Sequence, residues 1–200
     1  MRILTKIISV LFHPMLMPTL GIFLIFQAGT HLTYLPLEAR RIIYLTVFIS
    51  TCIMPLSLLP LFLQLKMIKS FQMESPRERL FPVFITGVFY FMGYLLLKKM
   101  SVPPMLGNFI LSSLLAVLLA VIITFFWKIS MHMIAIGGVT GVIMALALRF
   151  HIDLTFWISL LILASGILGA ARLHQGAHNP SQIYTGYLLG FIIVFGSVWI

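Results

Sequence analysis

Seven apolar stretches, each about as long as a membrane-crossing helix, constrain this sequence more than any other feature. They lie at about 8–27, 42–65, 81–97, 107–126, 132–149, 154–170 and 183–200. A helix needs roughly 20 mostly apolar residues to cross a bilayer, and only helices and closed barrels satisfy their own backbone polar groups in lipid. The stretches are too long for barrel strands. We therefore predict an all-α polytopic transmembrane helical bundle with six or seven spans, six if the proline-containing first stretch re-enters the membrane.

The composition excludes two other classes of protein. Hydrophobic residues make up 61% of the chain and charged residues 8%, whereas soluble domains carry about 25% charged residues. The apolar content also exceeds what a disordered chain tolerates. No linker or second domain interrupts the pattern, so we predict a single integral membrane domain over residues 1–200. We expect a multi-pass protein of a bacterial-type inner membrane or a plasma membrane.

The first stretch and the lone cysteine add two smaller predictions. Arg2 and Lys6 precede the first apolar stretch, as in a signal sequence, but that stretch lasts some twenty residues and lacks a convincing cleavage site. We interpret it as a retained anchor. Cys52 is the single cysteine, so a disulfide framework within the chain is excluded.

The chain is strongly basic, with 13 Lys and Arg against 4 acidic residues. The basic residues are scattered between apolar stretches, which argues against nucleic acid as a partner. Either they anchor the protein at the membrane surface and set its topology, or some of them form an anion site. Seven spans would place eight of the 13 on the N-terminal side and five on the other. Four of the eight are candidates for function, so the orientation stays undecided.

Basic residues, hydroxyls and histidines gather in three segments that seven spans would put on one side, 66–80, 127–132 and 171–182. They are Arg77, Arg79, Lys128, Ser130, His132, Arg172, His174 and His178. Ionisable groups near membrane helix ends are costly to bury and are commonly functional or paired. Phosphate suits this set, because arginine forks bind its oxygens, lysine adds a point charge and a hydroxyl completes the cradle. The pattern predicts an anion site at one membrane face.

Two of the histidines have the chemistry of phosphoryl transfer. A neutral imidazole can attack phosphorus and a protonated one can donate a proton to a leaving oxygen, so His132 and His178 could lie on opposite sides of one phosphorus. The alternative is that each is a hydrogen-bonded interfacial histidine. His174 and His178 are four residues apart, which on a helix would suit a metal. Gly176 and Pro180 oppose a helix there, and the segment has no Cys or acid, so we predict no metal.

Two of these segments also carry residues at the spacing of known motifs. Arg172 and His178 are separated by five residues, and Gln182 follows His178 after three more; Ser130 and His132 are separated by one. In these residues the chain resembles the type 2 phosphatidic acid phosphatase family, whose membrane bundles share a core with vanadium haloperoxidases. The motif-bearing core runs from about 66 to 190. The parity of the intervening stretches puts all three motifs of that family at one face.

The family's third motif is the best match and its second is partial. The third is Ser-Arg, five residues, His, three residues and Asp; here Ala171 takes the Ser place and Gln182 the Asp place. The second is Pro-Ser-Gly-His; here Ile129 replaces Pro and Met131 replaces Gly. Three of these departures, Ala171, Ile129 and Met131, stand directly next to residues that match. The fourth is Gln182.

The first motif, a Lys, six residues and Arg-Pro, is the weakest match. Arg79 or Arg77 takes the arginine place, but the positions seven residues earlier hold Gln72 and Ser70 instead of Lys. We therefore carry both arginines forward as candidates.

The resemblance implies a phosphatase or phosphotransferase that acts on a lipid phosphate without a metal or cofactor. His178 would be the nucleophile that becomes phosphohistidine, and His132 would protonate the leaving alcohol or phosphate. The phosphoryl oxygens would be held by Arg172, Ser130 and an arginine at position 77 or 79. Lys128, beside the second motif, is our own candidate for an added charge. The expected partners are a phosphorylated lipid and membrane lipids; no protein partner is predicted.

Gln182 leaves two functional hypotheses open. In the family an acid at this place orients the nucleophilic imidazole and stabilises its positive form; a glutamine carbonyl could still accept the ring N–H but has no negative charge. In serine proteases the change of the corresponding acid to an amide costs roughly four orders of magnitude in rate. The chain is then either a phosphatase, slow or aided by another acid such as Glu78, or a catalytically weak or inactive protein that binds or carries an anionic phospholipid. A channel or transporter is disfavoured because no acidic residue falls within a span.

Overall fold

The computed structural model describes residues 2–69 and 76–199, and these residues fold into helices and short links without a strand. Seven helical segments are long and apolar enough to cross a membrane, which confirms the predicted polytopic bundle. The elements are α1 (Arg2–Leu11), α2 (Met17–Gln27), the 3-10 turn η1 (His31–Tyr34), α3 (Leu37–Phe48), the π turn η2 (Ile49–Ile53), α4 (Met54–Gln64), α5 (Pro76–Lys99), α6 (Pro104–Phe126), α7 (Met131–Phe150), α8 (Thr155–His174) and α9 (Pro180–Trp199).

The first span is broken in two, at the proline that follows α1. Pro14 has no N–H to donate, and the chain turns there between α1 and α2. α1 has 10 residues, so it rises only about 15 Å, roughly half of a bilayer's hydrocarbon core. At the break the Met15 carbonyl accepts a hydrogen bond from Thr51 Oγ1 at 3.3 Å. A threonine of the second span thus satisfies a backbone group that the broken helix cannot.

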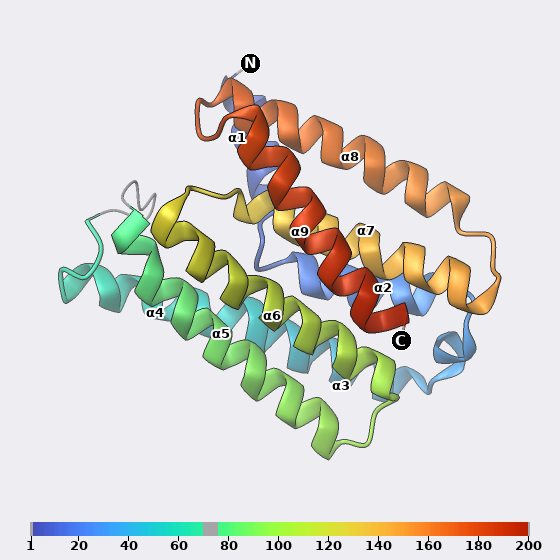
Figure 1. Ribbon diagram of the computed structural model, residues 1–200. Helices are drawn as coiled ribbons and strands as arrows, with labels where there is room; N and C mark the ends of the chain where they lie inside the picture. The colour runs from blue at the N-terminus through green and yellow to red at the C-terminus, as the bar shows by residue number, and fades with distance from the viewer. Residues whose placement is uncertain (1, 70–75, 200) are drawn as a thin grey trace.

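Helix α7 is the centre of the bundle. Two thirds of its spanning window is buried (67%), against 28–39% for the other spans, and it contacts α2, α6, α8 and α9 (Figure 1). Its most extensive contact is with α9, where glycines let the two backbones touch. A Cβ on Gly141 would lie 2.6 Å from the Phe191 carbonyl oxygen, and one on Gly190 would lie 2.7 Å from the Ile134 carbonyl carbon. These glycines form a packing surface between α7 and α9.

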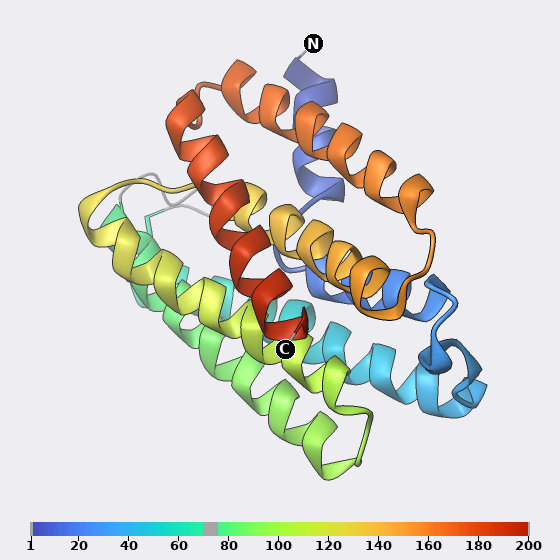
Figure 2. The ribbon, with the colours of Figure 1, turned by 45° about the vertical axis from the view of Figure 1, so that its right-hand side comes forward.

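Helix α8 packs against a different set of neighbours from that of α9, and part of its surface is open. It packs on α7 and on α1, and it diverges from α9 after the short link that joins them (Figures 1 and 2). A Cβ on Gly169 would make ordinary contact with Ile183, at 3.4 Å. A Cβ on Gly166 would meet nothing within 4 Å. Gly166 therefore faces open space between the diverging helices, not a neighbouring backbone.

The three segments predicted to share a face begin helices at the same end of the bundle. In Figure 1, α5, α7 and α9 start at the end where the N-terminus lies, while α6 and α8 start at the opposite end. The α6–α7 link (127–130) and the α8–α9 link (175–179) are therefore on the N-terminal side.

Candidate functional site

The α6–α7 link and the first turn of α9 are in backbone contact, and this contact builds one side of the site. The Ser130 amide donates a hydrogen bond to the Gln182 carbonyl oxygen at 3.4 Å. The approach depends on Gly186, one turn further along α9, where a Cβ would lie 2.9 Å from the Ser130 carbonyl oxygen. The residues of the second and third sequence motifs are thereby placed side by side.

His178 is oriented by Gln182. Its Nδ1 lies 3.1 Å from Gln182 Oε1, and the Asn179 backbone N–H donates to the same oxygen at 3.2 Å. Because a backbone N–H can only donate, the Gln182 atom that it meets is the oxygen and not the nitrogen. The imidazole must then donate from Nδ1. In the neutral ring this leaves the lone pair on Nε2, which is the nitrogen a nucleophile would use.

The same glutamine caps helix α9. The Gln182 backbone N–H donates to Asn179 Oδ1 at 3.0 Å, while Gln182 Oε1 accepts from the Asn179 backbone N–H. With Pro180 between them in the first turn, this is a reciprocal capping box. Gln182 therefore does two things at once: it closes the start of the helix and it sets the tautomer of His178.

Arg172 lies half-buried in the last turn of α8 and contacts α1. Its Nη1 donates to Gln175 Oε1 at 3.0 Å and to Ser9 Oγ at 3.4 Å. Gln175 Nε2 donates to the same serine oxygen at 3.1 Å. Ser9, buried on α1, thus lies where the guanidinium points, and the broken first span forms one wall of the site.

His132, in the first turn of α7, is bound to the same serine. Its Nε2 lies 3.1 Å from the Ser9 carbonyl oxygen, which can only accept, so Nε2 carries the proton. The ring of His13 meets it edge to face with centroids 5.7 Å apart. Arg172 and His178 both lie within electrostatic range of His132. The three residues on which the sequence prediction most depends are therefore brought together.

Ser130 lies in the same link, fully buried at 0% exposure. Within the part of the chain that the structure describes, its Oγ has no hydrogen-bond partner. A buried hydroxyl without a partner costs free energy, of the order of 1–3 kcal/mol, unless something binds it. Lys128 is two residues earlier and half-buried.

The two candidate arginines of the first motif have side chains outside the described residues. The backbone at positions 77 and 79 belongs to the start of α5. Leu80, near that start, lines a small cavity together with Ile129 and Met131. The start of α5 therefore lies against the α6–α7 link.

The alternative acid, Glu78, accepts a hydrogen bond from the Lys69 amide at 3.3 Å. This contact ties its carboxylate to the residues that follow α4. Glu74 lies outside the described residues.

His174 and His178 do not lie on one helix. Helix α8 ends at His174, and Gly176 turns the chain with a φ of +63° before α9 begins at Pro180. Among the residues described, no three His, Cys, Asp or Glu side chains converge.

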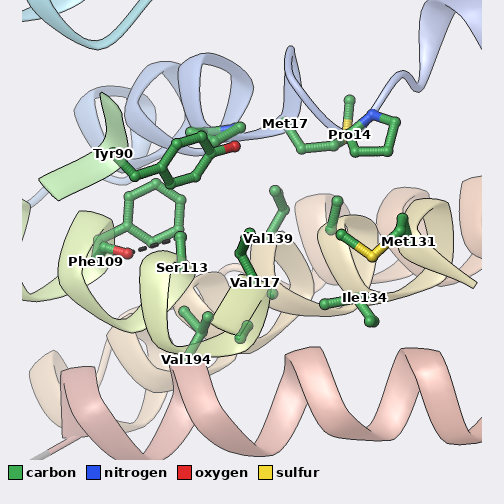
Figure 3. A pocket seen from close by; sticks show the side chains of 14 residues that line it. Pro14, Met17, Tyr90, Phe109, Ser113, Val117, Met131, Ile134, Val139 and Val194 are labelled. Carbon is green, nitrogen blue, oxygen red and sulfur yellow. Dashed lines mark hydrogen bonds between the residues drawn. The ribbon is translucent and has the colours of Figure 1, made fainter. Parts of the chain in front are cut away.

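A separate cavity lies inside the bundle, between α2, α6 and α7, beside the Pro14 break (Figure 3). Its volume is about 40 Å³, far below the roughly 300–1,000 Å³ of ligand sites. Ser113 on its wall donates to the Phe109 carbonyl oxygen at 2.8 Å. This cavity is too small to hold a lipid.

Three residues of the site escaped the sequence prediction: Ser9, His13 and Gln175. Ser9 is 123 residues from His132, and no local pattern relates the two. Gln175 stands three residues after Arg172, a spacing at which helical side chains meet. The segment Asn179-Pro-Ser-Gln182 also carries a capping-box pattern, from which the position of Gln182 could have been predicted.

The chain matches no protein-family model, no curated protein and no solved structure. What the site can do is set by its groups: an imidazole that donates from Nδ1, a guanidinium, a buried hydroxyl and a second imidazole. Together these groups can bind a tetrahedral anion and transfer its central atom to nitrogen.

Proposed function

We propose that this protein is a membrane-embedded phosphatase that resembles the type 2 phosphatidic acid phosphatases and hydrolyses a lipid phosphate monoester or pyrophosphate through His178. The observation that carries the proposal is the orientation of His178 by Gln182, together with His132, which lies within electrostatic range of both His178 and Arg172. An imidazole that donates from Nδ1 carries its lone pair on Nε2, the nitrogen that would attack phosphorus.

The reaction has two steps. In the first, His178 Nε2 attacks phosphorus, an N–P bond forms, the bond from phosphorus to the lipid oxygen breaks, and protonated His132 gives its proton to that oxygen. In the second, water attacks phosphorus, the N–P bond breaks, inorganic phosphate leaves and the proton released by water returns to His132. His178 is then neutral again and the cycle is complete.

Substrate binding would replace the contacts of Ser9. In the structure this residue takes a hydrogen bond from Arg172 through its hydroxyl and one from His132 through its carbonyl. Phosphoryl oxygens of the substrate would accept the guanidinium hydrogen bond in place of the Ser9 hydroxyl. The leaving oxygen would accept the His132 hydrogen bond in place of the Ser9 carbonyl. The Ser130 hydroxyl would gain the partner that it lacks among the described residues. Lys128 and an arginine at position 77 or 79 would add positive charge.

The membrane setting supports a lipid substrate. The described residues, 2–69 and 76–199, include seven helical segments able to cross a membrane, and the site lies at one end of the bundle. A helical bundle, unlike an outer-membrane barrel, suits a bacterial-type inner membrane or a plasma membrane.

The test is phosphate release by the purified protein in detergent. The substrates are phosphatidic acid, phosphatidylglycerol phosphate, polyprenyl phosphate and pyrophosphate, and a lipid A phosphate. His178→Ala should reduce release to background while the protein stays folded, because the N–P bond cannot form. His174→Ala is the matched control: it removes an exposed histidine four residues away and should leave release unchanged. Undiminished release by His178→Ala would overturn the nucleophile assignment.

A second candidate is a protein that binds or carries an anionic phospholipid without turnover. Gln182 favours it, because a neutral amide cannot stabilise the imidazolium as a carboxylate would. It predicts no release from any substrate, together with retention of anionic lipid that Arg172→Ala abolishes. Retention no greater than that of a neutral lipid would count against it.

A further inference from the structure

A groove opens between α8 and α9, directly beside the site. Its volume is about 550 Å³, within the roughly 300–1,000 Å³ of ligand sites. One wall is the stretch of α8 from Ile162 to Leu173, the other is the start of α9 from Pro180 to Tyr187, and Met133 of α7 also lines it. The groove exists because the two helices diverge from their link (Figure 2).

The length and chemistry of the groove fit one hydrocarbon chain. Residues 162–173 of α8 rise about 16 Å at 1.5 Å per residue, close to half of the roughly 30 Å hydrocarbon core, that is, one leaflet. The walls are mostly apolar, and the Ser165 hydroxyl donates to the Leu161 carbonyl oxygen of its own helix at 2.7 Å. Gly166 keeps one wall open, since a Cβ there would meet nothing within 4 Å.

One end of the groove adjoins positive charge. Leu173 directly follows Arg172, and Pro180 is two residues after His178. A molecule that fills the groove and reaches the site must therefore have an anionic head and an apolar chain. Inorganic phosphate has no chain, and a neutral lipid has no charge to meet the guanidinium.

We infer that this groove holds a hydrocarbon chain of the lipid whose phosphate lies at Arg172, His132 and His178. The inference rests on the proposed function for the nature of the head group. It adds the route by which the lipid enters, sideways from one leaflet between α8 and α9.

The first experiment fills the groove. Gly166→Leu places a side chain in the open wall, and leucine favours a helix more than glycine does, so folding should be preserved. For a phosphatidic acid with long acyl chains we expect kcat/KM to fall at least tenfold. For one with four-carbon chains it should stay within twofold of the wild type.

Gly196→Leu is the matched control. Gly196 also has nothing within 4 Å of its Cβ position, but it does not line the groove. Both substrates should be hydrolysed at the wild-type rate. An equal loss for long and short chains in Gly166→Leu, or no loss for either, would overturn the inference while the proposed function stands.

The second experiment does not need turnover. A phosphatidic acid with a photoreactive diazirine in its acyl chain is cross-linked to the wild type and to His178→Ala, and the labelled residues are identified by mass spectrometry. We expect labels on the groove faces of α8 and α9, removed by unlabelled phosphatidic acid but not by diacylglycerol. Equal competition by diacylglycerol would mean a general lipid contact and would overturn the inference. Specific labelling without phosphate release would uphold the groove and refute the phosphatase.

Discussion

At the scale of single residues, Gln182 decides what this site can do. It caps α9 through Asn179 and orients His178, and both contacts use the same side-chain oxygen. A carboxylate at this position would keep both contacts and add a negative charge. The site therefore has the geometry of a histidine–carboxylate pair without the negative charge.

Gln182→Glu should accelerate phosphate release roughly ten- to a hundredfold, a part of the roughly 10⁴ that the reverse kind of change costs a serine protease. The added charge stabilises the imidazolium that develops as His178 attacks phosphorus and the N–P bond forms. It should also favour the protonated ring and so move the acidic limb of the pH–rate profile to higher pH. Steady-state phosphate release between pH 5 and 9 measures both effects.

Ser181→Glu is the control for charge alone, since it puts a carboxylate in the same helical turn on an exposed residue. It should stabilise α9 slightly through the helix dipole and leave the rate near that of the wild type. Equal acceleration by both variants, or by neither, would contradict a special role for position 182.

At the scale of elements, the α7–α9 pair holds the molecule together and places the site. The glycines of α9 let its backbone touch α7, and Gly186 in the same row lets the first turn meet the α6–α7 link. The close backbone contact of this pair places Ser130 against Gln182, which orients His178.

Gly190→Ala should destabilise the protein by roughly 1–3 kcal/mol, as overpacking of a core does. Its Cβ would lie 2.7 Å from the Ile134 carbonyl carbon and 3.0 Å from the Gly138 amide nitrogen, so the helices must move apart. Thermal unfolding in detergent, followed by circular dichroism, measures the change. Gly196→Ala, in open space on the same helix, should be neutral or slightly stabilising. An unchanged melting temperature for Gly190→Ala would show that the pair is loosely packed.

The elements also show what sequence patterns can predict. Apolar length identified all seven spans, because a bilayer sets that length physically. The spacing of Arg172 and His178 predicted that both belong to one site, and the structure places both within electrostatic range of His132. The sequence did not predict the role of Ser9, because its contacts depend on the orientation that the break at Pro14 gives to α1. A glycine at position 166 does not by itself show whether a helix or an open groove faces it, and only the structure shows the open space there.

At the scale of the whole molecule, the number of helices that cross the membrane between two links decides whether these links lie on the same side. An odd number places them on opposite sides. Three spans, α6, α7 and α8, separate the link before α6 from the link before α9. Ser101 and Ser181 are exposed residues in or next to these two links. If all three helices cross, these serines lie on opposite sides of the membrane, and only Ser181 lies on the side of the site.

Single-cysteine labelling tests this arrangement. Cys52 is the single cysteine of the chain and is buried, so Cys52→Ser gives a background in which Ser101→Cys and Ser181→Cys are near-isosteric probes. With a membrane-impermeant maleimide on intact cells, one probe should react and the other should react only after the membrane is opened. The probe that reacts first also assigns the site to the outer or the inner face, a choice that the distribution of basic residues leaves open. Reaction of both probes in intact cells would mean that one of the three helices does not cross, and the leaflet-deep groove beside α8 would then lose its membrane setting.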